Sequence, residues 1–327
     1  MQIVKCAVTA LMVFGSLLSV LDGYAQESAT KAKDASAKPI KVIFDTDIGD
    51  DVDDAFALAL LVSRPEVNLL GVTTAWGDTA LRARLTARFL ASGYSGIPIY
   101  AGPKTVSKAT FSQAPYAMAY PAKDWPDATA FVLDEIRKYP GQITLIAVAP
   151  FSNVGALIDR DPATFRKLKR IVLMGGSVHR GYGDLGYPWS TPVKASPEYN
   201  VDSDVASSKK LFAAGVPIAM MPLDSTQLKL DEVKRDALFS HGSAMTDNLT
   251  LLYYQWSAST GSPTPTLFDA MAVAAAIRPD LCPTTPMHIR IDNQGGTIAE
   301  AGEPNADVCL QSNTQNFFDF YLTSVLK

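Results

Sequence analysis

The chain has 327 residues, of which 47% are hydrophobic and 19% charged, and its formal net charge is −4. This composition provides enough apolar surface for a packed core and excludes global disorder. An acidic balance without basic clusters also excludes the electrostatic footprint of a nucleic-acid-binding protein.

Residues 1–25 have the features of an export signal. Lys5 places a positive charge before the mainly apolar run at residues 7–21, and Ala25 ends a plausible cleavage site of small residues. The run is shorter than the roughly 20 residues of a membrane-spanning helix, which favours cleavage over an anchor. We expect residues 26–39, rich in Ala, Ser and Lys, to be a flexible linker and residues 40–327 to be the catalytic domain. The mature protein is then periplasmic or secreted, without membrane attachment.

Two cysteines remain once the signal and its Cys6 are removed, Cys282 and Cys309. In an oxidising compartment they can pair as a disulfide, and two buried free thiols are the alternative. Neither has the neighbouring His and Cys spacing of a zinc site.

Runs rich in β-branched residues alternate with segments of helical periodicity from residue 40 onward. We expect strands at residues 41–44, 67–74, 97–100, 143–148, 171–174 and 216–221. We expect helices at residues 53–62, 81–90, 128–138, 203–214, 244–257 and 268–277, with Arg82, Arg84 and Arg88 on an outer face. This alternation predicts a single α/β domain with a doubly wound, mainly parallel sheet flanked by helices. In such a sheet, functional residues follow the carboxyl ends of the strands.

Six aspartates fall within residues 45–54, between an expected strand and an expected helix. Helix capping accounts for one or two of them, not for six. A divalent cation would relieve their mutual repulsion, and hard carboxylate oxygens favour calcium or magnesium. The spacing lacks the final glutamate of an EF-hand loop.

A strand followed by Asp-x-Asp also fits haloacid dehalogenase-type phosphatases. Those enzymes also have a later Ser or Thr, a Lys and an acidic pair, and these cannot all be placed convincingly in this sequence.

The aspartate cluster opens a series of five motifs, in which the chain resembles the inosine–uridine-preferring nucleoside hydrolase family over roughly residues 40–320. That family has Asp-x-Asp-Pro-Gly, a spacer and Asp-Asp-Ala; here Ile48 replaces the proline and the spacer has two extra residues. The other motifs lie at residues 149–153 (Ala-Pro-Phe-Ser-Asn), 171–176 (Ile-Val-Leu-Met-Gly-Gly), 198–200 (Glu-Tyr-Asn) and 268–269 (Phe-Asp, where the family has His-Asp).

The resemblance implies a role for each matched position. The activity would be calcium-dependent hydrolysis of the N-glycosidic bond of ribonucleosides, with Asp47 as general base for a metal-bound water. The calcium ligands would be Asp47, Asp54, Asp269 and the backbone carbonyl of Val148. The residues implied to hold or lie under the ribose are Asp53, Asp78, Met174, Glu198 and Asn200. The resemblance also implies a homo-oligomer, a dimer or a tetramer.

The residues around the base are less defined. Phe268 cannot donate a proton as the family's histidine does, so the leaving-group acid is not identified. His179 follows Gly176 and is a candidate to reach the base, but a surface histidine is the favoured alternative. It lies in a Gly-, Pro- and aromatic-rich loop at residues 177–197, which is longer than the family pattern and suits a lid or an interface. The aromatic residues that could stack on a base are Trp76, Tyr182, Trp189 and Tyr199. Packing in the loop or at an interface is the alternative, and the preferred base stays open.

Three functions are compatible with these patterns: a ribonucleoside hydrolase, a hydrolase of another N-ribosyl or sugar substrate on the same fold, and a non-catalytic ribose-binding protein. The crowded aspartates argue against the third, because simple ribose binding does not need them. Asp224 is expected to be a capping or loop residue.

Overall fold

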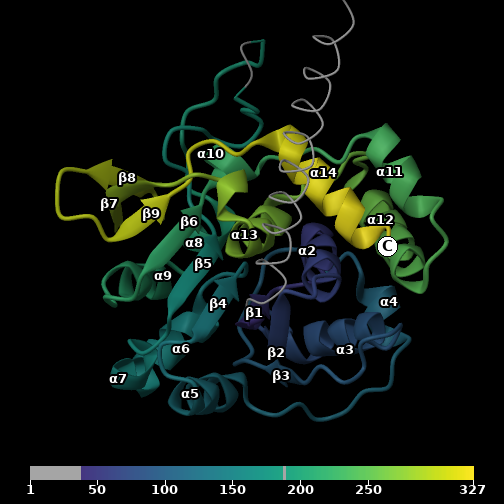
Figure 1. Ribbon diagram of the computed structural model, residues 1–327, viewed down its shortest axis with the longest axis horizontal. Helices are drawn as coiled ribbons and strands as arrows, with labels where there is room; N and C mark the ends of the chain where they lie inside the picture. The colour runs from purple at the N-terminus through teal and green to yellow at the C-terminus, as the bar shows by residue number, and fades with distance from the viewer. Residues whose placement is uncertain (1–37, 187–188) are drawn as a thin grey trace, which may run out of the picture. The chain divides into compact units, whose positions relative to one another are not determined.

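The structure is a computed structural model that describes residues 38–186 and 189–327, and residues 40–327 form one compact unit. The proposed signal peptide and most of the linker lie outside the described residues. A nine-stranded sheet, counted over the described residues, runs through this unit with helices on both faces (Figure 1). Among the described helices, none combines the length and the apolar character required to cross a membrane.

The sheet has the strand order β3-β2-β1-β4-β5-β6-β9-β7-β8. Its strands are β1 (Ile40–Thr46), β2 (Val67–Thr74), β3 (Ile99–Ala101), β4 (Ile143–Ala147), β5 (Arg170–Met174), β6 (Ile218–Met221), β7 (Thr285–Ile291), β8 (Thr297–Glu300) and β9 (Ala306–Val308). Strands β1 to β6 and β9 pair in parallel, whereas β7 pairs antiparallel with β8 and β9. The predicted fold class is therefore confirmed, and the antiparallel edge is an addition that the sequence patterns did not reveal.

The described residues contain thirteen α-helices and one 3-10 helix. They are α2 (Asp53–Val62), α3 (Thr79–Leu90), α4 (Ala114–Met118), α5 (Ala128–Lys138), α6 (Ser152–Arg160), α7 (Pro162–Phe165), α8 (Tyr199–Ser203), α9 (Val205–Phe212), α10 (Leu223–Thr226), α11 (Glu232–Phe239), α12 (Ala244–Thr260), α13 (Phe268–Ile277), η1 (Pro279–Leu281) and α14 (Thr314–Val325). Helices α2, α5 and α13 match the predicted ranges.

Short polar side chains determine where several helices begin. Asp78, Asp127 and Asp204 each precede a helix and accept a hydrogen bond from the backbone N–H three residues later. Ser243 forms a reciprocal capping box with Thr246 at the start of α12. These caps satisfy N–H groups that have no partner inside the helix. The cap at Asp78 explains why α3 begins two residues before the predicted range.

Alternation along the strands separates the core into two layers. Phe44 packs with residues of α2, α12, α13 and α14 on one face, whereas its neighbour Ile43 packs with residues of α5, α6 and α9 on the other. Both faces of the central strands are covered, so these strands read as nearly continuous apolar runs. Polar residues therefore gather where the strands end.

The prediction that Arg82, Arg84 and Arg88 face outward is wrong. The segment that carries α4 covers this side of α3, and Arg88 donates to the carbonyl of Tyr116 at 2.7 Å while Arg84 donates to the carbonyls of Met118 and Tyr120. Arg82 is only 1% exposed and lies beside the aspartate cluster. Helical periodicity identifies the polar face of a helix, but it does not predict whether a distant loop will pack over that face.

Cys282 and Cys309 form a disulfide, which decides between the two alternatives that the sequence left open. Cys282 follows η1 and Cys309 follows β9, and both side chains are buried. The bond therefore links the end of the α13–η1 segment to the last parallel strand.

We predict that the Cys282→Ala/Cys309→Ala double variant loses about 3 kcal/mol of unfolding free energy, because the bridge closes a loop of 27 residues in the unfolded chain. Urea unfolding of the oxidised wild type and the variant measures the difference. Dithiothreitol should destabilise the wild type by a similar amount and leave the variant unchanged; an equal effect on both proteins would contradict the assignment.

Candidate active site

A cavity of about 380 Å³ opens at the carboxyl ends of the central strands. It lies where the order of the parallel strands reverses, between β1 and β4, which is the position at which doubly wound sheets bind ligands. The predicted site residues that line it are Asp47, Asp53, Asp54, Val148, Met174, Glu198, Asn200, Phe268 and Asp269. The fold thus brings together residues that lie more than 200 positions apart in the chain.

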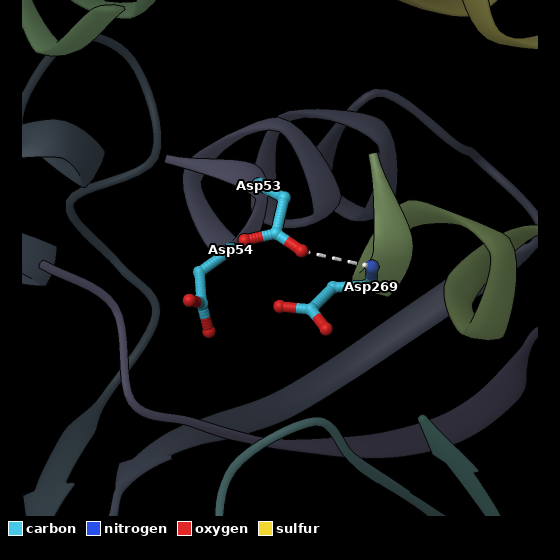
Figure 2. Close-up of side chains that lie close together, drawn as sticks. All are labelled: Asp53, Asp54 and Asp269. Carbon is cyan, nitrogen blue, oxygen red and sulfur yellow. Dashed lines mark hydrogen bonds between the residues drawn. The ribbon is translucent and has the colours of Figure 1, made fainter. Parts of the chain in front are cut away.

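Three buried carboxylates form the centre of the cavity (Figure 2). Asp53 and Asp54 occupy the first turn of α2 and Asp269 the first turn of α13, and oxygens from all three lie within 4.8 Å of one another. The backbone N–H of Asp269 donates to Asp53 Oδ2 at 3.2 Å, and the Thr46 hydroxyl donates to Asp54. The positive ends of two helices therefore converge on the same group of acids.

Burial and mutual repulsion make this cluster unfavourable as a set of free carboxylates. Burial raises the pKa of Asp54 to about 7. The pKa values of Asp47, Asp53 and Asp269 lie well above their usual range; burial is the largest cause, and repulsion by neighbouring carboxylates adds to it. A divalent cation offsets this repulsion, and carboxylate oxygens are the donors that calcium and magnesium prefer. The residues present therefore fit a hard divalent cation.

The predicted metal ligands Asp47, Asp54, Asp269 and Val148 all line this cavity, and Asp53 lines it beside them. Asp53, predicted to hold ribose, lies in the carboxylate group, because it is adjacent to Asp54 in the same helical turn and faces the start of α13. Asp47 lines the same cavity at the end of β1. The carbonyl of Val148 accepts from Asn200 Nδ2 at 3.0 Å.

The opposite wall is built from the motif at residues 198–200. Glu198 caps α8, and its carboxylate accepts from the backbone N–H groups of Gly176 at 2.8 Å, Asn200 at 3.0 Å and Val201 at 3.2 Å. Burial nevertheless raises its pKa to about 7. Asn200 Nδ2 also donates to the carbonyl of Met174 at 3.1 Å, so a single amide joins the ends of β4 and β5.

Among the described residues, four aromatic side chains line the same cavity: Tyr182, Tyr199, Trp256 and Phe268. The rings of Tyr182 and Phe268 meet edge to face with centroids 6.1 Å apart. The Tyr182 hydroxyl accepts from the backbone N–H of Tyr199 at 3.0 Å and lies 3.5 Å from a Glu198 oxygen. The loop that follows β5 therefore reaches the cavity through Tyr182.

Four residues that were predicted to contact substrate do not line the cavity in the described structure: Trp76, Asp78, His179 and Trp189. Asp78 caps α3 through one carboxylate oxygen and pairs with Lys104 at 2.9 Å through the other. His179 is exposed, and Trp189 is 81% exposed. Trp76 contributes its carbonyl to Arg82.

Asp224, expected to be a capping or loop residue, lies instead within α10, where it accepts hydrogen bonds from a neighbouring loop. It lies buried in α10, and its two carboxylate oxygens accept from the backbone N–H groups of Val178 and His179 at 2.9 and 2.8 Å. The start of the long loop at residues 177–197 is thereby fastened to β6 and α10, and the side chain of His179 faces solvent.

Sequence reasoning missed part of the cavity lining. The missed residues are Asp50, Asp51, Ala109, Thr110, Ser112, Trp256, Ser259 and Thr260. Asp50 and Asp51 were visible in the cluster without an assigned role. The predicted helix at 244–257 ended one turn too early, and the additional turn of α12 carries Ser259 and Thr260. Ser and Thr at a helix end are normally exposed to solvent, so no pattern in the sequence marked them.

Comparison with known proteins agrees with this architecture. The family model described as inosine-uridine preferring nucleoside hydrolase matches residues 42–319. The chain is 27% identical to uridine nucleosidase 1 of Arabidopsis thaliana over 286 residues, covering 80% of this chain and 81% of that protein. It is 28% identical to the pyrimidine-specific ribonucleoside hydrolase RihB of Escherichia coli (strain SE11) over 284 residues, covering 78% and 84%.

Solved structures show the same fold. A plant nucleoside hydrolase superposes with a TM-score of 0.76 at 21% identity, covering 88% of this chain and 99% of that one. A purine-preferring ribonucleoside hydrolase from Gardnerella vaginalis superposes with a TM-score of 0.73 at 22% identity, covering 88% and 98%. The family match spans the strands and helices that build the cavity, and with it the phosphatase alternative is set aside. The chain belongs to the inosine-uridine preferring nucleoside hydrolase family, a family of N-glycosyl hydrolases.

Proposed function

We propose that the protein hydrolyses the N-glycosidic bond of ribonucleosides to free base and ribose, and that it requires calcium. The observation that carries this proposal is the group of three buried carboxylates, Asp53, Asp54 and Asp269, at the floor of a cavity that Asp47 also lines. The relatives are named for uridine, pyrimidine or purine ribonucleosides. Because these names differ in the base, the proposal covers ribonucleosides as a class.

Calcium, when bound, supplies a grip on the ribose diol and lowers the pKa of the attacking water. Asp47 accepts the proton of that water, since it lies at the end of β1 beside the carboxylate group. Cleavage passes through an oxocarbenium-like state, and the carboxylates around the sugar stabilise its positive charge. The aromatic wall of Tyr182 and Phe268 limits water access to the sugar.

We also propose that the protein acts after export, as a scavenger of nucleosides outside the cytoplasm. The disulfide between Cys282 and Cys309 supports this proposal, because such bonds form and persist in oxidising compartments. The charge and apolar run of residues 1–25 support it independently.

Asp47→Asn should lower kcat by about 10²–10⁴-fold, because the amide cannot accept the proton of the attacking water. Release of base and ribose from inosine, adenosine, guanosine, uridine and cytidine, followed by chromatography with calcium and with chelator, measures this. Asp78→Asn is the matched control: it keeps a capping side chain outside the cavity, so its turnover should equal that of the wild type. No release from any of the five by a calcium-loaded wild type would redirect the proposal to another N-ribosyl substrate.

2′-Deoxyribonucleosides should be hydrolysed with a kcat/KM about 10²-fold lower than the matching ribonucleosides. The missing hydroxyl leaves buried charged groups without a partner, and hydrogen bonds to charged groups contribute about 1.5–3 kcal/mol each. Parallel kinetics on inosine and 2′-deoxyinosine, or on uridine and 2′-deoxyuridine, test this. Equal kcat/KM values would show that the carboxylate group does not hold the ribose diol.

The stability of the metal-free protein should fall as the pH rises from about 4 to about 8. Burial raises the folded-state pKa of Asp54 to about 7, well above that of a free aspartate, and the pKa values of Asp47, Asp53 and Asp269 are raised as well. A carboxyl with a raised folded pKa contributes its full stability below the unfolded pKa and loses it as the pH passes the folded one.

Thermal unfolding in chelator and in calcium measures this dependence. Calcium at 100 times its Kd should restore about 2.7 kcal/mol at the upper end of the range. The gain should be smaller at the lower end, where protons compete for the ligands. A chelated protein whose stability increases between these pH values would contradict the electrostatic account.

A further inference from the structure

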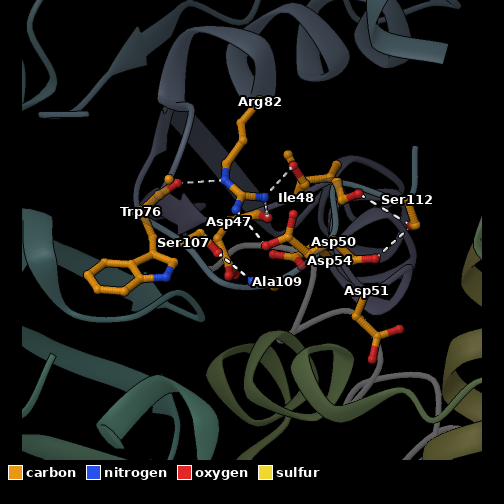
Figure 3. A network of polar contacts seen from close by, with 12 residues as sticks. Asp47, Ile48, Asp50, Asp51, Asp54, Trp76, Arg82, Ser107, Ala109 and Ser112 are labelled. Carbon is orange, nitrogen blue, oxygen red and sulfur yellow. Dashed lines mark hydrogen bonds and ion pairs between the residues drawn. The ribbon is translucent and has the colours of Figure 1, made fainter. Parts of the chain in front are cut away.

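Arg82 is a buried cation beside the aspartate cluster, and the proposed mechanism does not use it (Figure 3). Its side chain, which comes from α3, is only 1% exposed and forms hydrogen bonds with Trp76 and with the segment at residues 47–50. Its Nε donates to the carbonyl of Trp76 at 2.7 Å, its Nη2 pairs with Asp50 at 2.7 Å, and its Nη1 donates to the carbonyls of Asp47 and Ile48. Burial of an arginine is costly unless its donors are satisfied in this way.

The segment at residues 47–51 depends on donors outside itself. Arg82 holds the first two carbonyls, and the carbonyl of Gly49 accepts from the backbone N–H of Gln113 at 3.1 Å. The carbonyls of Asp50 and Asp51 accept from the Ser112 hydroxyl and from Gln113 Nε2, each at 2.6 Å. Each carbonyl from residue 47 to residue 51 therefore has a donor from α3 or from the segment before α4. These side chains replace the regular ladder that would fix a strand or a helix.

The packing around Arg82 is equally constrained. Gly49 has a φ of +128°, and a Cβ at this position would lie 2.2 Å from the ring of Phe111, over which the guanidinium lies at 5.1 Å. Trp76 has a φ of +62° and is the only non-glycine residue with a positive φ among the described residues. Backbone strain of this kind persists only where surrounding contacts impose it. The carbonyl of this strained residue is the one that accepts from Arg82 Nε.

The pairing partner of Arg82 comes from the part of the chain that departs from the family pattern. The spacer between Gly49 and Asp53 is two residues longer than the family pattern, and Asp50, which lies in it, forms the ion pair. A longer spacer has more conformational freedom between Asp47 and the carboxylates at the start of α2. The planar guanidinium of Arg82 binds two adjacent carbonyls and the Asp50 carboxylate in the spacer, and it removes that freedom in a way that an ammonium group cannot.

We propose that Arg82 is a positioning residue for the calcium site: its guanidinium fixes the backbone of Asp47 and Ile48 and thereby the relation of the Asp47 carboxylate to Asp54 and Asp269. The inference rests on the proposed function, in which these carboxylates bind calcium and Asp47 takes a proton. It makes a prediction opposite to that of simple charge balance. A cation that only reduces the negative charge of the cluster would weaken calcium binding, so its removal would tighten it.

The test compares calcium affinity, measured by isothermal titration, with kcat and KM in the wild type, Arg82→Lys, Arg82→Met and the double variant Arg82→Met/Asp50→Asn. The double variant removes both charges of the buried pair and so avoids an unpaired Asp50. Arg88→Met is the matched control, because Arg88 lies on the same helix and donates to a backbone carbonyl, but of Tyr116.

Positioning predicts that all three Arg82 variants bind calcium at least about tenfold more weakly and lose at least about tenfold in kcat at saturating calcium, since a 1 Å displacement of a catalytic group has effects of this size. The double variant should regain the thermal unfolding midpoint that Arg82→Met loses, but it should not regain the kcat of the wild type. Arg88→Met should keep the calcium affinity and kcat of the wild type.

Two results would overturn the inference while leaving the proposed function intact. Wild-type affinity in Arg82→Lys with tighter binding in Arg82→Met would show that only the charge matters. Wild-type affinity and kcat in the double variant would show that Arg82 merely neutralises Asp50. A wild type that binds calcium but hydrolyses no ribonucleoside would defeat the proposed function, and the affinities alone would still test the positioning role. A wild type that binds no calcium would overturn both.

Discussion

The burial of several carboxylates at one point is the constraint on which the rest of this structure depends. Asp47, Asp53, Asp54 and Asp269 lie at the cavity between β1, α2 and α13, and burial together with mutual repulsion raises the pKa of each. No arrangement of apolar contacts removes that cost. It is tolerable only if the surrounding fold is rigid and if protons or a cation compensate the charge.

The fold provides rigidity by fixing the backbone of the acidic segment from several directions. β1 places Asp45 in the sheet, where its carboxylate accepts from Thr73 Oγ1 at 2.5 Å and Asn153 Nδ2 at 2.6 Å. Beyond the strand, Arg82 and the Ser112–Gln113 pair bind the carbonyls of residues 47–51. α2 then begins with two acids in its first turn, where the helix dipole favours them.

The opposite wall follows the same rule, in which polar side chains satisfy backbone groups and hold the site residues in place. Glu198 accepts from three backbone N–H groups, and Asn200 joins the carbonyls of Val148 and Met174. Asp224 fastens the loop from which Tyr182 reaches the cavity. Residues that were expected to contact substrate therefore also position the strand ends, and the two roles are compatible because a carboxylate or an amide has more than one hydrogen-bonding atom.

The alternation of strands and helices, the doubly wound sheet and most of the residues at its carboxyl edge could be predicted from the sequence alone, because periodicity and motif order depend on neighbours along the chain. The sequence did not reveal that Arg82 is buried, that Asp53 joins Asp54 and Asp269, that Asp78 turns to Lys104, or that the last turn of α12 lines the cavity. Each of these depends on which distant segment packs against a helix face or a strand end. Only the tertiary structure decides such contacts, since their energies come from groups that are separated in sequence and meet on folding.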